Sequence, residues 1–218
     1  MADSGSKSVC VIACGALARE TLAILEANQM NHVELRCLSA LLHNRPEKIP
    51  GAVREAIGLA REDGFEQILI GYADCGTGGL LDHVIEEENV SRIGGPHCYA
   101  FFSGTEKFIK EYEDICTAFF LTDFLARQFD SMVMVPLGLD KHPELRDMYF
   151  GNYEKVVYLA QSEDPDLDRR AEDAARKLGL AYERRQTGFG DLTDFLTGAD
   201  PDTSRREARP LSGATGTT

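Results

Sequence analysis

Short apolar runs alternate with longer amphipathic segments along most of the chain. Runs rich in Val, Ile and Leu predict buried strands, and apolar residues at every third or fourth position predict helices that cover them. The predicted strands span 8–13, 33–39, 67–72, 90–93, 156–160 and 181–185, and the predicted helices span 16–28, 50–63, 80–87, 106–113, 119–129 and 165–178. This order predicts an α/β fold, with a mostly parallel sheet built from βαβ units and helices on both faces.

The alternating pattern runs from residue 8 to residue 198, and we predict a single α/β domain over this span. Residues 1–7 are polar and are expected to be disordered, and residues 199–218, rich in Ser, Thr, Pro and Gly, are expected to form a tail that is mobile at its end. A chain of 218 residues can bury a hydrophobic core without disulfides or a structural metal. Stability therefore does not require the cysteines.

The charge balance limits the partners of the chain. Lys and Arg number 23 against 36 Asp and Glu, which gives a formal net charge of −13. Such a chain repels nucleic-acid backbones and anionic membrane surfaces. Its first apolar run is too short for a signal peptide or a membrane span. We predict a cytoplasmic protein with neither nucleic acid nor a membrane as a partner.

The chain has six cysteines, and no two of them have CxxC spacing. In a reducing compartment such thiols stay reduced unless they bind a metal or do redox work. Cys10 and Cys37 lie within predicted strands, and Cys116 lies just before a predicted helix. Free cysteine is often a small buried hydrophobe, so we expect these three to be structural.

Cys14, Cys75 and Cys98 have a different setting. The first two each follow a predicted buried strand, and each is followed by glycine and then by a predicted helix. Ligands of parallel sheets bind beyond the carboxyl ends of the strands, and a helix N-terminus favours a thiolate. Cys98 follows the next short strand, with His97 beside it.

We therefore expect three thiolates to share one sheet edge and to bind a metal. Three thiolates with an optional imidazole suit Zn²⁺ as a Cys3His site, or an iron–sulfur cluster with one iron left open. The predicted metal ligands are Cys14, Cys75, Cys98 and His97, and the residues expected to line the bound group are Gly15, Gly76, Thr77 and Gly78.

Two other interpretations fit the same residues. In one, Cys75 is the nucleophile of a transferase, Asp74 and His97 tune its thiol, and Thr77 with the N–H groups of the turn holds an anion. In the other, the turn 75–79 cradles the phosphate of a nucleotide at the following helix. That turn contains no Lys or Arg and does not match the common phosphate-binding patterns.

Four short motifs carry a resemblance to a known family. They are Ala13-Cys14-Gly15, Cys75-Gly76-Thr77-Gly78, His97-Cys98 with an apolar run and Gly104 after it, and Gly190-Asp191-Leu192. Over about residues 8–210 the chain resembles the domain-of-unknown-function family 1638. Many relatives have His-Asp-Cys where this chain has Pro96-His97-Cys98, and the segment 120–127 is similar to a subgroup feature.

Members of that family are commonly encoded beside corrinoid proteins, methyltransferases and one-carbon enzymes. The resemblance implies a role in corrinoid- or folate-linked methyl transfer, such as methionine synthesis. It also implies a corrinoid protein or a methyltransferase as the partner.

Overall fold

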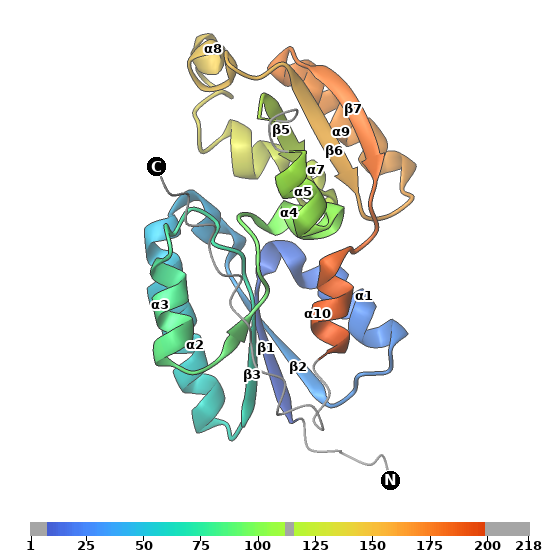
Figure 1. The fold of residues 1–218 in the computed structure, drawn as a ribbon. Coiled ribbons are helices and arrows are strands. Elements are labelled where there is room, and N and C mark those ends of the chain that lie inside the picture. The colour runs from blue at the N-terminus through green and yellow to red at the C-terminus, as the bar shows by residue number, and fades with distance from the viewer. Residues whose placement is uncertain (1–7, 112–115, 199–218) are drawn as a thin grey trace, which may run out of the picture. The chain divides into compact units, whose positions relative to one another are not determined.

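The computed structural model describes residues 8–111 and 116–198, which form two compact units, each with its own sheet (Figure 1). The first unit contains the described residues up to Pro96 and again from Asp194, and the second contains those from His97 to Thr193. All paired strands are parallel and helices surround them, as predicted. The span 8–198, predicted as one domain, thus contains two sheets. The predictions for residues 1–7 and 199–218 lie outside the described residues.

The sheet of the first unit has the strand order β2-β1-β3-β4. Its strands are β1 (Val9–Cys14), β2 (Val33–Leu38), β3 (Gln67–Gly71) and β4 (Ser91–Arg92). Every residue of β1 is buried, which explains its unbroken apolar sequence. The neighbouring strands β1 and β3 pair as far as Ala13 and Gly71, so the loops that follow them begin at the same edge.

Three helices of the first unit cover its sheet. They are α1 (Ala18–Ala27), α2 (Ile49–Glu62) and α3 (Leu80–Glu87), and the loops hold the 3-10 turns η1 (Gly15–Leu17), η2 (Ala40–Asn44) and η3 (Pro46–Lys48). Figure 1 shows α2 and α3 on one side of β1 and α1 on the other. Right-handed crossovers between parallel strands produce this arrangement.

The sheet of the second unit has the order β5-β6-β7, with strands β5 (Ala118–Leu121), β6 (Lys155–Ala160) and β7 (Ala181–Gln186). Side chains of the central strand β6 alternate between two apolar clusters. Val156 and Tyr158 pack with α7 (Asp123–Arg127) and α9 (Pro165–Leu178), whereas Val157 and Leu159 pack with α4 (Cys98–Ser103) and α5 (Thr105–Lys110). The remaining elements are the π-helix η4 (Asp130–Met134), η5 (Pro143–Leu145), α8 (Arg146–Phe150) and α10 (Asp191–Thr197).

The helix predicted over 119–129 is wrong in its first part, which is strand β5, and is confirmed in its second part, which is α7. Phe119 packs edge-on against Phe150, and Phe120 stacks on Tyr99 in the other apolar cluster. Adjacent residues that point to opposite faces are typical of a strand. A strand covered on both faces is a continuous apolar run, which periodicity alone does not separate from a buried helix. Thr122 then caps α7 by accepting a hydrogen bond from the Leu125 N–H.

No helix in the described part of the chain combines the length and the apolar character needed to cross a membrane.

Candidate thiol site

Cys14 is the last residue of β1, and it is 6% exposed. The loop after it lies against the end of β2, because a Cβ atom added to Gly15 would be 2.9 Å from the carbonyl oxygen of Leu38. A real Cβ essentially never comes that close to a backbone oxygen. Gly15 therefore lets the chain turn tightly beside the thiol, and this explains the Cys-Gly pair after the first strand.

The turn after β3 is organised by the carboxylate of Asp74. Its oxygens accept hydrogen bonds from the backbone N–H groups of Gly76, Gly78 and Gly79 at 3.2, 3.3 and 2.8 Å. They also accept one from the Thr77 hydroxyl at 2.7 Å. The N–H of Thr77 donates to the Asp74 carbonyl oxygen. The donors of the Gly-rich turn thus bind the Asp74 carboxylate, an anion that belongs to the turn itself.

This arrangement shifts the pKa of Asp74 and occupies the donors of the turn. Partial burial raises the pKa of that carboxyl, but the hydrogen bonds from Gly79, Thr77, Gly78 and Gly76 outweigh the burial and leave it below its usual value. A phosphate or an oxyanion at the same N–H groups would have to displace the carboxylate. The geometry therefore argues against the turn as an anion cradle.

Cys75 sits within this turn in an unusual backbone conformation. Its φ is +49°, in the left-handed region that favours glycine, and its side chain is buried. The Cys75 N–H donates to the carbonyl oxygen of Pro96 at 2.9 Å, and the Asp74 N–H donates to that of Gly95 at 3.1 Å. Two strand-like hydrogen bonds and the Asp74 network hold the thiol-bearing residue in a conformation that costs about 1–2 kcal/mol for a non-glycine residue.

His97 and Cys98 begin the second unit. His97 has an extended backbone and is the N-cap of α4, and Cys98 is the first residue of that helix and is partly buried. The His97 ring stacks on Tyr99, with the centroids 4.9 Å apart, and Tyr99 stacks in turn on Phe120 of β5 at 5.0 Å. This row of three rings fixes the orientation of the imidazole and gives a structural role to the segment 120–127.

The Gly190-Asp191-Leu192 motif secures the chain that follows Cys98. The Asp191 carboxylate accepts a hydrogen bond from the Thr105 N–H at 2.7 Å, at the junction of α4 and α5. Gly190 has a φ of +50°, and a Cβ atom there would overlap the carbonyl oxygen of Phe101 and lie 2.7 Å from that of Phe102. Only glycine fits this close approach, so the motif positions α4 rather than contributing chemistry.

Of the three cysteines expected to be structural, one is buried and two are exposed. Cys10 is fully buried, as predicted, and burial raises the pKa of its thiol to about 11. Cys37 and Cys116 are exposed, so the expectation that they are buried is wrong. Cys37 lies on the edge strand β2, and Cys116 lies in the turn before β5. Partial desolvation first, and the nearby Cys14 second, raise the pKa of Cys37.

The predicted site residues fall into two groups. In the first unit, Cys14 ends β1 and Cys75 follows the neighbouring strand β3. Gly15, Gly76, Thr77 and Gly78 lie in the same two loops, whereas His97 and Cys98 belong to the second unit. Within residues 8–111 and 116–198, no group of three or more His, Cys, Asp or Glu side chains is arranged to hold a metal ion. Gly76 lies near Pro46, 3.7 Å from where its Cβ would be, so the loop after β2 also reaches this edge.

A family model described as "Protein of unknown function (DUF1638)" matches residues 37–196, well over half of the chain. The chain belongs to the DUF1638 family. No curated protein and no solved structure matches it significantly. The DUF1638 match includes Cys75, His97, Cys98 and the Gly190-Asp191 pair, and it begins after Cys14.

Sequence reasoning missed how the DUF1638 turn is held together. An Asp that comes shortly after a buried strand and precedes several glycines is typical of a side chain that binds its own turn, and this signal is present at Asp74, two residues beyond Tyr72. The carbonyl oxygens of Gly95 and Pro96, which accept from the N–H groups of Asp74 and Cys75, carry no such signal, because a backbone hydrogen bond between residues distant in sequence does not depend on their types.

Proposed function

We propose that this DUF1638 protein is a metal- or iron–sulfur-binding accessory protein of corrinoid- and folate-linked one-carbon metabolism in the cytoplasm. Cys14, Cys75 and Cys98 are its proposed thiolate ligands, and His97 is the candidate fourth. The observation that carries the proposal is the rigid turn that holds Cys75 at φ +49° beyond the end of β3, beside the strand that ends in Cys14. The metabolic role rests on the family resemblance.

The chemistry of the donors suits a soft or borderline metal. Thiolates select Zn²⁺ and iron–sulfur clusters over hard cations such as Mg²⁺. The Asp74 carboxylate is engaged by its own turn, so it is not proposed as a ligand. A zinc ion bound here would act as a Lewis acid or a structural clamp, and a cluster would carry electrons.

Chain connectivity supports Cys98 as the third ligand. The Cys75 N–H is bonded to the Pro96 carbonyl, and Cys98 follows Pro96 by two residues. Two residues span at most about 7 Å, so the Cα atom of Cys98 is within that distance of the Cα atom of Pro96. The fixed orientation of the His97 ring against Tyr99 supports the imidazole as a positioned donor.

The strained backbone of Cys75 favours a second candidate, a thiol-dependent transferase. Strained residues cluster at active sites, and in some hydrolases a sharp, strained turn after a strand presents the nucleophile to the substrate. In such a reaction the Cys75 thiolate would form a bond to a methyl or acyl carbon, and the donor group would leave with the bonding electrons of the bond that breaks. The engaged N–H groups of the turn would not stabilise an oxyanion, which favours methyl over acyl transfer.

Elemental analysis and an anaerobic absorption spectrum of the untagged full chain distinguish these candidates. The proposal predicts stoichiometric zinc, or iron with a broad band near about 400 nm. Cys14→Ser, Cys75→Ser and Cys98→Ser should each lose the metal. Cys10→Ser is the matched control and should keep it, because Cys10 is buried near the start of β1, at the opposite end of the strand from Cys14.

Metal-free wild-type protein that is folded by circular dichroism would contradict the metal site. Labelling of the buried Cys75 by iodoacetamide faster than that of the exposed Cys37 and Cys116 would then support the transferase, and slower labelling of Cys75 would contradict both candidates. The metabolic role has its own test in the native host. Loss of the gene should make growth depend on supplied methionine, and a Cys75→Ser copy should fail to restore growth where a Cys10→Ser copy succeeds.

A further inference from the structure

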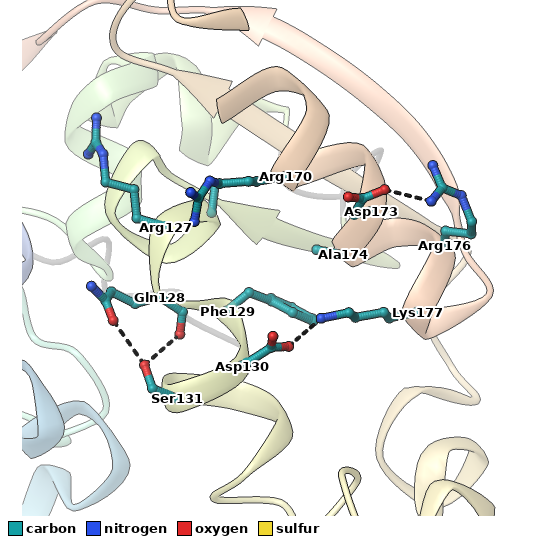
Figure 2. A pocket seen from close by; sticks show the side chains of 11 residues that line it. Arg127, Gln128, Phe129, Asp130, Ser131, Arg170, Asp173, Ala174, Arg176 and Lys177 are labelled. Atoms are coloured by element: carbon teal, nitrogen blue, oxygen red, sulfur yellow. Dashed lines mark hydrogen bonds and ion pairs between the residues drawn. The ribbon is translucent and has the colours of Figure 1, made fainter. Parts of the chain in front are cut away.

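The second unit has a groove between α7 and η4 on one side and α9 on the other, which we call the α7–α9 groove (Figure 2). Its volume is about 790 Å³, within the range of small-molecule sites. Phe129 and Ala174 line it and belong to the buried core beneath. Part of its wall is the π-helical turn η4, a rare backbone form that is frequently found at functional sites.

The groove is rich in positive charge although the chain as a whole carries a formal charge of −13. Its basic lining residues are Arg127, Arg170, Arg176 and Lys177, and its acidic ones are Asp130 and Asp173. At one end Asp173 pairs with Arg176 and Asp130 pairs with Lys177, as the dashed lines in Figure 2 show. Arg127 and Arg170 lie at the other end.

The two arginines at this end, Arg127 and Arg170, are incompletely paired with carboxylates. Arg170 donates to Asp166 at 2.7 Å, but the same carboxylate also binds Arg169, which does not line the groove. The carboxylate nearest to Arg127 is Asp123, whose Oδ2 atom is 3.8 Å from Arg127 Nη2, beyond hydrogen-bond distance.

Asp123 is already engaged elsewhere. Its oxygens accept hydrogen bonds from the Tyr158 hydroxyl, the Gln161 N–H and the Ser162 hydroxyl. Arg127 Nη1 is shielded from solvent and has no hydrogen-bond acceptor among the described residues. An unsatisfied buried donor is costly, and a bound ion or water is one way to satisfy it. The Arg127 side chain as a whole is 22% exposed, and it lines the groove.

We infer that the α7–α9 groove binds an anionic small molecule that carries a phosphate or carboxylate group. Arg127 and Arg170 bind that group, since guanidinium groups match the oxygens of both anions in a bidentate manner. Phe129 and Ala174 contact the remainder of the ligand. The inference is independent of the thiol site, because none of the residues that line the groove is a proposed metal ligand.

Titration of the full chain with inorganic phosphate and, separately, with succinate tests this inference. Thermal stability and calorimetric binding are measured at low ionic strength and compared with sodium chloride at equal ionic strength. Saturable stabilisation by phosphate or succinate beyond that of chloride supports the inference, and the better probe identifies the anion class. Arg127→Gln and Arg170→Gln should each weaken binding about tenfold, as expected for the loss of a charged hydrogen-bond donor.

Arg169→Gln is the matched control, because Arg169 lies on the same helix and binds the same Asp166 without lining the groove. Its affinity for the probe should equal that of the wild type. Equal stabilisation by chloride, phosphate and succinate would overturn the inference, and so would Arg170→Gln binding as tightly as Arg169→Gln. Arg170 is half exposed, so its replacement tests binding without disturbing the core. Metal content should not change in any of these variants.

Discussion

The Asp74 carboxylate accepts a hydrogen bond from the backbone N–H of Gly79 at 2.8 Å, five residues further along the chain. With the bonds from Thr77, Gly76 and Gly78, this contact closes the loop that carries Cys75. The turn is therefore ordered without a bound ligand, and the Asp74 carboxylate accepts four of the hydrogen bonds that order it.

Asp74→Ala should lower the free energy of unfolding at pH 7 by about 1–3 kcal/mol, because it leaves several turn donors without their acceptor. The folded-state pKa of Asp74 lies below its unfolded value, so its contribution is present above the unfolded pKa and is lost as the pH falls through the folded pKa. Urea unfolding at pH 7 and below pH about 4 should show a smaller difference from wild type at the lower pH. Glu66→Gln, an exposed change in the same unit, should show neither effect.

Cys75→Gly should be more stable than Cys75→Ala by about 0.5–1 kcal/mol. Both variants lose the sulfur, but only glycine relieves the left-handed strain, even after its larger loss of backbone entropy. Gly78→Ala introduces comparable strain in open space and should cost a similar amount. Thermal melts of Cys75→Gly, Cys75→Ala and Gly78→Ala measure these differences in stability. An alanine variant as stable as the glycine variant would show that residue 75 is not held at positive φ.

Gly190→Ala should destabilise the chain by more than about 2 kcal/mol, since the new methyl group overlaps the carbonyl oxygens of Phe101 and Phe102. Gly188→Ala is the matched control. Gly188 also has a positive φ, +63°, but its Cβ would meet nothing within 4 Å, so only backbone strain is added. If chemical denaturation gives equal losses for the two variants, the close packing at Gly190 is not the reason for the glycine.

Tyr158→Phe should lower the free energy of unfolding at pH 7 by about 1–3 kcal/mol, because the Tyr158 hydroxyl donates at 2.7 Å to the buried Asp123 carboxylate. Burial first, and that hydrogen bond second, raise the pKa of Tyr158 far above its usual value. Its stabilising contribution is therefore complete below the unfolded pKa of about 10 and is lost as the pH rises above it. Thermal melts should show a smaller difference in stability between wild type and Tyr158→Phe above pH about 10 than at pH 8.

Tyr149→Phe serves as the control for this measurement, because Tyr149 is 40% exposed on α8. It should leave stability unchanged at both pH values. A Tyr158→Phe protein that loses as much stability in alkali as the wild type would contradict the assignment.

Local sequence determined the elements that begin or end at a capping residue, a proline or a glycine. The helix predicted over 165–178 is confirmed in full: Asp164 caps it, Pro165 opens it, and Gly179 closes it at a φ of +65°. The helix over 80–87 and the placement of Cys14 at the end of a buried strand are confirmed for similar reasons. Caps, glycines and apolar runs act over a few residues, so a single sequence contains the information.

Tertiary structure alone decided the rest. β5 became a strand because partners on both of its faces, among them Phe150 and Tyr99, bury the consecutive side chains of Phe119 and Phe120. The pairing of strands into two sheets, the capture of Cys75 by the Pro96 carbonyl and the incomplete pairing of Arg127 likewise depend on groups distant in sequence. Backbone carbonyls are the same in every residue, and which carboxylate an arginine pairs with depends on the distances between them in the folded chain. Residue types therefore do not record which partner a group finds.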